Sequence, residues 1–365
     1  MTLFLCGDVM TGRGVDQILP HPGGQQIFES YVQDAREYVT LAEAHNGPIP
    51  KPVNAAYIWG DALPELARLA PDARIVNLET SVTTSDDYWR GKGINYRMHP
   101  ENIACLTAAR IDVCSLANNH VLDYGYAGLT ETVETLKRVG LKAVGAGRTR
   151  TEAQAPAIVL LPNGTRVIVV AFGAETSGIP RDWAAGPERA GVDLLPDLSE
   201  ATAREIAARA RQVRGPRDMV VASIHWGGNW GYDVPRSHVL FAHWLVDGGV
   251  DIVYGHSSHH PRPIEVYRNR LILYGCGDFI DDYEGIEGHG EYRGDLVLMY
   301  FATVSAATGE LTDLQMTPMQ IRKMKLNRPS LADAGWLRDT LERVSAPYGT
   351  HVDLSTDGRL SLRRH

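Results

Sequence analysis

The stretch Gly255-His256-Ser257-Ser258-His259-His260 directly follows the apolar run Val250–Tyr254. The run has the length and composition of a buried β-strand, so it places three imidazoles at one strand end. Other polar clusters also follow apolar runs, and these are Gly7-Asp8, Asn77-Leu78-Glu79, Asn118-Asn119-His120 and His225-Trp226-Gly227. Polar side chains that gather from several strand ends are typical of a metal or catalytic site.

Composition limits the class of protein. The chain has 365 residues, of which 44% are hydrophobic, enough for one large α/β domain with insertions or about two domains. The net charge of −8, without a basic stripe, argues against nucleic acid as a partner. The cysteines are scattered, without Cys-x-x-Cys, at Cys6, Cys105, Cys114 and Cys276. This favours buried thiols in a reducing cytosol over disulfides.

No segment reads as a signal peptide, and no run approaches the ~20 apolar residues of a membrane span. We therefore expect a cytoplasmic protein without a membrane partner.

Strand and helix patterns alternate along the chain. Predicted strands are Thr2–Cys6, Arg74–Leu78, Asp112–Leu116, Met219–Ile224, Val250–Tyr254, Leu296–Val304 and Leu311–Met316. Hairpins are expected for 157–161 with 166–172, around Asn163-Gly164, and for 264–267 with 271–274. Predicted helices are 28–46, 61–70, 129–139, 199–213, 237–246 and 331–344. This order favours an α/β fold, a mixed β-sheet sandwich flanked by helices.

We expect a main domain at 1–320 and a C-terminal helix-and-strand extension at 321–365 that packs on it. The loop-rich segments 14–60, 80–98, 174–198 and 277–295 follow the polar clusters and are expected to form the rim of the site.

The polar clusters supply carboxylate, amide and imidazole ligands for a divalent ion. The candidate ligands are Asp8, Glu79, Asn118, Asn119, His225 and His256. The large share of oxygen and the absence of a positioned thiolate favour Ca²⁺, Mn²⁺ or Mg²⁺ over Zn²⁺, as one ion or two. Each residue also has a plain alternative: Asp8 could cap a turn, Glu79 could pair with an arginine, and the asparagines could be turn residues.

Two histidine–aspartate pairs are candidates for acid–base chemistry. His120 and Asp123 are three residues apart, and a carboxylate at one ring nitrogen raises the basicity of the other. His259 or His260 could pair with Asp278 or Asp281; we name His259 and Asp278 as catalytic candidates with the first pair. Alternatively, Asp123 only caps a turn and His260 is solvated.

Aromatic residues cluster in the expected rim loops. Tyr124, Trp226 and Trp230 are candidate substrate-binding residues, because an aromatic rim suits a peptide better than a bare phosphate. Arg13 could hold a substrate carboxylate or phosphate bidentately, or could be the structural partner of an acid.

Taken in order, the motifs resemble those of the CapA family, named for poly-γ-glutamate capsule synthesis and grouped with the calcineurin-like metallophosphatases. They are Gly7-Asp8-Val9-Met10 with Arg13, Asn77-Leu78-Glu79, Asn118-Asn119-His120 with Asp123-Tyr124-Gly125, His225-Trp226-Gly227 and Gly255–His259. The resemblance spans roughly residues 2–305 and implies a calcineurin-like metallophosphatase fold.

The resemblance also implies roles for single residues. It makes Asp8 and Glu79 carboxylate ligands, Asn119 an amide ligand and His120 the catalytic imidazole. It makes His225, His256 and His259 the later imidazole ligands. This sequence departs from the metallophosphatase pattern at Met10, where a ligand histidine is usual, and at Glu79, where aspartate is usual. Losing one ligand favours a single ion and weakens the case for dinuclear phosphoester hydrolysis.

Three functions are compatible with these features. The first, which we favour, is a metal-dependent peptide epimerase that inverts the Cα of a C-terminal residue in a ribosomally made precursor such as a lasso peptide. The second is a metal-dependent phosphoesterase or other hydrolase. The third is a component of poly-γ-glutamate or capsule biosynthesis, which the lack of a visible membrane anchor disfavours.

Overall fold

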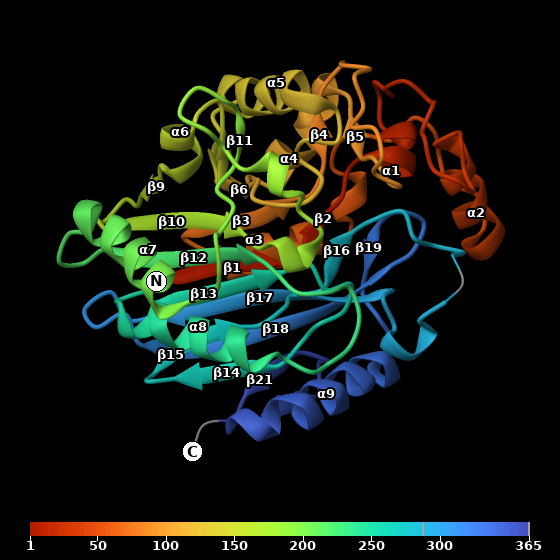
Figure 1. Cartoon of the computed structure of the whole chain (residues 1–365). Helices are drawn as coiled ribbons and strands as arrows, with labels where there is room; N and C mark the ends of the chain where they lie inside the picture. Colours follow the sequence, from red (N-terminus) through yellow and green to blue (C-terminus); the bar gives the residue numbers. More distant parts are fainter. Residues whose placement is uncertain (287, 364–365) are drawn as a thin grey trace.

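Two β-sheets packed face to face form the centre of the computed structural model, which describes residues 1–286 and 288–363 (Figure 1). The larger sheet has 11 strands, in the order β16-β2-β3-β1-β17-β18-β21-β20, with β6 and β7 joined through β3 and with β19 on β18. Its strands are β1 (Thr2–Cys6), β2 (Asp8–Val9), β3 (Ala73–Leu78), β6 (Val113–Ser115), β7 (Lys142–Val144), β16 (Asp278–Ile280), β17 (Leu296–Val304), β18 (Leu311–Ile321), β19 (Leu326–Asn327), β20 (Val352–Leu354) and β21 (Leu360–Leu362).

The second sheet has six strands in the order β14-β15-β13-β12-β10-β9. These are β9 (Ala157–Leu160), β10 (Arg166–Gly173), β12 (Met219–His225), β13 (Ile252–His256), β14 (Ile264–Tyr267) and β15 (Arg270–Leu273). Both expected hairpins are confirmed, because β9 pairs antiparallel with β10 and β14 with β15. Two small sheets add β4 (Ser81–Val82) with β5 (Arg97–Met98) and β8 (Ala146–Gly147) with β11 (Gly191–Val192).

Helices cover the outer faces of this sandwich. The main ones are α2 (Arg36–Asn46), α3 (Ala62–Leu69), α5 (Gly125–Arg138), α7 (Glu200–Val213), α8 (Arg236–Asp247) and α9 (Leu331–Ser345); short ones are α1 (Arg13–Ile18), α4 (Ala104–Ala108) and α6 (Arg150–Gln154). Ser199 and Ser330 cap α7 and α9 by accepting a backbone N–H. The predicted mixed sandwich flanked by helices is confirmed, whereas assignment to the calcineurin-like fold stays a prediction.

One predicted helix begins later than expected. The pattern from Phe28 suggested helix throughout 28–46, but α2 begins only at Arg36. The segment before Arg36 is not helical. It is fixed by an isolated β-bridge between Gln26 and Asp34 and by the ion pair of Glu29 with Arg13. Tertiary contacts there override the local helical spacing.

Successive residues of the central strands face two different hydrophobic cores. On β10, Val167 and Val169 lie in the core between the sheets, while Ile168 and Val170 lie in the core beneath α7 and α8. Burial on both faces explains why these strands read as continuous apolar runs.

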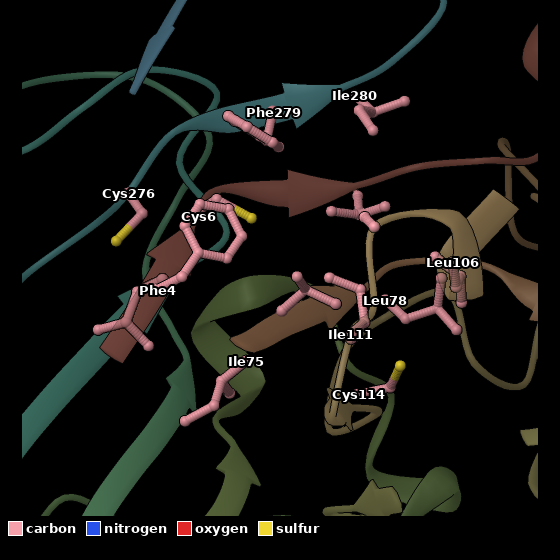
Figure 2. Close-up of a cluster of buried hydrophobic side chains, with 14 of the residues drawn as sticks. Phe4, Cys6, Ile75, Leu78, Leu106, Ile111, Cys114, Cys276, Phe279 and Ile280 are labelled. Atoms are coloured by element: carbon pink, nitrogen blue, oxygen red, sulfur yellow. The ribbon is translucent and has the colours of Figure 1, made fainter. Parts of the chain in front are cut away.

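Cysteine side chains are part of the core between the sheets. Figure 2 shows Cys6, Cys114 and Cys276 among side chains such as Phe4 and Phe279. All four cysteines are free and buried, which confirms the prediction of structural thiols.

The C-terminal region continues the larger sheet. Strand β21 pairs with β18, and α9 packs against β20 and β14 (Figure 1). The expected boundary at 320 falls within β18, and the division into 1–320 and 321–365 stays a prediction. Among the described residues, no helix is both long enough and apolar enough to cross a membrane.

Candidate metal centre

Strand register brings the polar clusters into rows. Parallel strands β16, β2 and β3 place Asp278 beside Asp8, and Asp8 beside Asn77. Parallel strands β12 and β13 place His225 beside His256 at their carboxyl ends. Because the two sheets pack face to face, the carboxylate row of one meets the imidazole row of the other.

Asp8, His225 and His256 form a buried group that could hold a metal ion. Each offers one ligand atom, and these atoms all lie within 4.8 Å of one another. Ser257, which follows His256, has a φ of 106° and directs its backbone N–H to Asp8 Oδ2 at 3.3 Å. A non-glycine residue in this conformation is strained, and such strain is typical of functional sites.

The electrostatics of the three residues suit a cation. Burial lowers the pKa of His256 to about 3, and burial together with His256 lowers the pKa of His225 well below its usual range. Both rings are therefore neutral at pH 7, the protonation state that metal ligation requires. In this structure the two rings share a hydrogen bond, with His225 Nδ1 2.7 Å from His256 Nδ1, and a bound ion would replace that contact. Burial and the charge of Asp278 raise the pKa of Asp8 to about 7. A divalent cation would compensate this buried carboxylate.

The donor set favours borderline metals. Two of the three donors are imidazoles, which suit Mn²⁺, Fe²⁺ or Zn²⁺ better than Ca²⁺ or Mg²⁺, ions that prefer all-oxygen sites. The expected preference for Ca²⁺ or Mg²⁺ over Zn²⁺ thus finds no support in this group, whereas Mn²⁺ stays compatible with it.

Glu79 and Asn119 lie directly beside this group. His225 Nε2 is 2.9 Å from Asn119 Oδ1 and 3.5 Å from Glu79 Oε1. The amide of Asn77 donates to both Asp8 Oδ1 and Glu79 Oε2, each at 2.7 Å. Burial and the neighbouring Asp8 raise the pKa of Glu79 well above its usual range. Both residues are therefore placed to complete a coordination shell.

Asn118 occupies a supporting position instead. Its amide nitrogen donates to Asn77 Oδ1 at 3.0 Å and to the Leu78 carbonyl at 2.8 Å. Its amide oxygen accepts the His120 backbone N–H at 3.1 Å. With both ends of the amide engaged, Asn118 fixes the neighbouring residues and is not placed as a ligand.

The first predicted histidine–aspartate pair is present and has an unexpected third member. His120 Nδ1 lies 2.6 Å from Asp123 Oδ2, and the ammonium of Lys92 contacts both Asp123 Oδ1 and, at 2.9 Å, His120 Nδ1. Burial, followed by the charge of Lys92, lowers the pKa of His120 to about 4. His120 is therefore neutral at pH 7.

The second predicted pair is also present. His259 Nδ1 lies 2.8 Å from Asp278 Oδ1, whereas His260 turns away toward the Pro261 carbonyl. Burial is the largest single influence on the His259 pKa and lowers it, but the contacts with Asp278 outweigh burial and the net pKa is raised. The two pairs thus differ in the protonation state that they favour.

The expected rim residues lie mostly inside the protein. Tyr124 and Trp226 are buried; the Trp226 indole N–H donates to the Tyr274 carbonyl, and the Arg97 guanidinium covers the Tyr124 ring. The expectation that these two side chains line an exposed rim is wrong, because both complete a core. Trp230 is half-buried, with its ring centroid 5.3 Å from that of His259, so it lies at the site.

Arg13 is a structural partner of acidic residues, which was the second of the two roles expected from the sequence. Its guanidinium is buried and donates to Glu29 Oε1 at 2.7 Å and to Asp282 Oδ1 at 2.5 Å. Buried arginines require such partners, so this side chain is committed to acids of the protein. The substrate-anchoring alternative is not supported.

Sequence reasoning missed Asn77 and Lys92 as site residues. Asn77 stands two positions before Glu79 near the end of β3, and this period-two spacing was a usable signal. Lys92 lies in the loop between β4 and β5, where no periodicity marks a single lysine.

These features define an α/β protein with a candidate metal centre at the strand ends and two histidine–aspartate pairs beside it. The model of the family described as Bacterial capsule synthesis protein PGA_cap matches residues 2–283, and the chain belongs to this family. The resemblance to CapA proteins is thereby confirmed.

Similar proteins support the assignment of the chain to this family. The chain is 48% identical, over 99% of its length and 96% of the relative, to a probable polyglutamine synthesis accessory protein of Mycobacterium tuberculosis. It is 27% identical to the PGA biosynthesis protein CapA of Bacillus subtilis, over 89% of this chain and 75% of that protein. It is 28% identical to the capsule biosynthesis protein CapA of Bacillus anthracis, over 77% and 60%. None of these names concerns peptide epimerisation, so the lasso-peptide expectation finds no support in them.

Proposed function

We propose that this chain is a metal-dependent hydrolase that acts on an amide-linked polymer of glutamate or glutamine during capsule or cell-envelope polymer synthesis. The observation that carries the proposal is the buried group of Asp8, His225 and His256, in a chain with a full-length relative named for polyglutamine synthesis. The substrate class follows the names of the relatives, and the reaction class follows the chemistry of the site.

A divalent ion held by Asp8, His225 and His256 would polarise a carbonyl and acidify water. The side chains supply the proton transfers. Neutral His120, oriented by Asp123, takes a proton from the attacking water, and protonated His259, backed by Asp278, gives one to the leaving amine. The C–N bond breaks, and the acyl carbon gains the water oxygen.

The test is a cleavage assay with defined polymers. Protein stripped with EDTA and reloaded with Mn²⁺ or Zn²⁺ is incubated with γ-linked glutamate and α-linked glutamine oligomers, and products are read by mass spectrometry. We expect metal-dependent fragments and a loss of at least ~100-fold in His120→Ala. Intact oligomers with metal-loaded protein, alongside turnover of an aryl phosphate, would instead establish a phosphoesterase.

A second function is favoured by the paired histidines. Two imidazoles with opposite preferred protonation are also what proton exchange at a Cα requires, one removing the proton and one returning it. Incubation of the same oligomers in D₂O distinguishes the two reactions. Deuterium at the Cα of uncleaved chains indicates an epimerase, and fragments that retain hydrogen at every Cα indicate a hydrolase.

A further inference from the structure

A pair of tyrosines connects the two histidine–aspartate pairs. Tyr96 and Tyr283 come from segments 187 residues apart, yet their hydroxyl oxygens lie 2.7 Å from each other. The Tyr96 ring meets His120 edge-on at 4.4 Å, and the Tyr283 ring meets His259 edge-on at 5.4 Å. The two hydroxyl groups therefore lie in the region between the proposed base and the proposed acid.

The hydrogen bonds around the two tyrosines leave the Tyr283 hydroxyl available as a donor. Either phenol can donate in the hydrogen bond between them. When Tyr283 directs its hydroxyl to the Met10 sulfur, 3.4 Å away, the shared hydrogen comes from Tyr96. A thioether is a weak acceptor, and the Tyr283 hydroxyl can exchange it for an oxygen at little cost. Tyr96 is buried, whereas Tyr283 is half-buried.

A fixed cation lies beneath both rings. The Arg13 guanidinium carbon is 4.4 Å from the Tyr96 ring centroid and 5.7 Å from that of Tyr283. Asp282 and Glu29 hold the guanidinium in place. Burial and the charge of Asp278 raise the net pKa of the Tyr283 phenol, while the Arg13 charge acts in the opposite direction, to lower that pKa, and so favours donation from the hydroxyl.

We infer that Tyr283 is a substrate-binding residue whose hydroxyl donates to an anionic or carbonyl oxygen of the substrate between His120 and His259. Tyr96 and Arg13 are the positioning residues that polarise it. This inference rests on the proposed function for the identity of the substrate, but not for the presence of an oxygen-binding donor.

The experiment measures binding, not turnover. Titration calorimetry of the metal-loaded full chain uses two probes, tri-γ-glutamate and inorganic phosphate, with wild type, Tyr283→Phe, Tyr96→Phe and the control Tyr292→Phe. Tyr292 is a nearby phenol whose ring stacks on His260. We expect Tyr283→Phe to weaken binding about tenfold to hundredfold and Tyr96→Phe about threefold, with unchanged metal affinity. Each variant should also lower the melting temperature slightly, because the remaining hydroxyl loses its partner. Tyr292→Phe should bind like wild type.

The outcomes separate the role inferred for Tyr283 from the substrate proposed above. If wild type binds phosphate but not tri-γ-glutamate, and Tyr283→Phe weakens the phosphate complex, the inference stands and the proposed substrate is wrong. If Tyr283→Phe binds the probes as tightly as wild type, or wild type binds neither probe, the inference is overturned.

Discussion

At the scale of single residues, Asp8 is the only carboxylate in the buried three-residue group found among the described residues. Replacing it by asparagine removes the charge that balances a divalent ion while keeping the side-chain size. We predict that Asp8→Asn lowers affinity for Mn²⁺ or Zn²⁺ by at least ~100-fold in titration calorimetry. Asp339→Asn, on the exposed face of α9, should leave affinity unchanged, and equal affinities in all three proteins would remove Asp8 from the centre.

The raised pKa of Asp8 predicts how metal affinity depends on pH. Below a pKa of about 7, an incoming ion must displace a proton from Asp8, whereas above it the carboxylate is already ionised. Affinity should therefore fall about tenfold per pH unit below pH 7 and level off above it. Calorimetry at pH 6 in two buffers of different ionisation enthalpy should detect at least about one proton released per ion. Release of no proton would contradict this.

At the scale of elements, strand β13 depends on close approach to its neighbours. A Cβ at Gly255 would lie 2.6 Å from the Tyr274 carbonyl oxygen and 2.7 Å from that of Leu273. We predict that Gly255→Ala costs about 1–3 kcal/mol of stability and weakens metal binding, because the adjacent His256 must shift. Denaturant unfolding and metal titration measure both effects.

The matched control is Gly335→Ala in helix α9, where nothing lies within 4 Å of the new methyl group. It should stabilise the protein by about 0.5–1 kcal/mol through helix propensity and leave metal binding unchanged. If Gly255→Ala were as harmless as the control, strand spacing would not set the geometry of the centre.

At the scale of the whole molecule, one buried tyrosine ties the two sheets together. Tyr254 on β13 donates to the Cys6 carbonyl at 2.5 Å and accepts the Asn77 N–H at 3.2 Å. Tyr254→Phe leaves both backbone groups unpaired, at about 1–3 kcal/mol each. Since Asp8 and His256 lie on different sheets, we also expect weaker metal binding.

Tyr300→Phe provides the comparison, because the hydroxyl of this buried tyrosine has no hydrogen-bond partner within the described part of the chain. Its removal should be neutral or slightly stabilising in thermal unfolding. Similar losses of melting temperature in the two variants would show that the link between the sheets carries no special stability.

Local patterns predicted much of the fold and part of the site. Apolar runs placed the strand ends, the Asn-Gly turn placed the β9–β10 hairpin, and His120 with Asp123 was foreseen because both lie in one turn of chain. The sequence left two roles open for Arg13 and did not predict the burial of Trp226, because local sequence carries no sign of the direction in which a side chain points.

The sequence alone was enough to predict which strand ends carry carboxylate, amide and imidazole side chains that could hold a metal ion, since strand period and apolar runs are properties of single segments. Only the tertiary structure decided that Asp8 meets His225 and His256, that Lys92 joins His120, and that Tyr283 reaches Tyr96. These contacts depend on strand register and on how two sheets pack, and both arise from interactions between residues far apart in the chain.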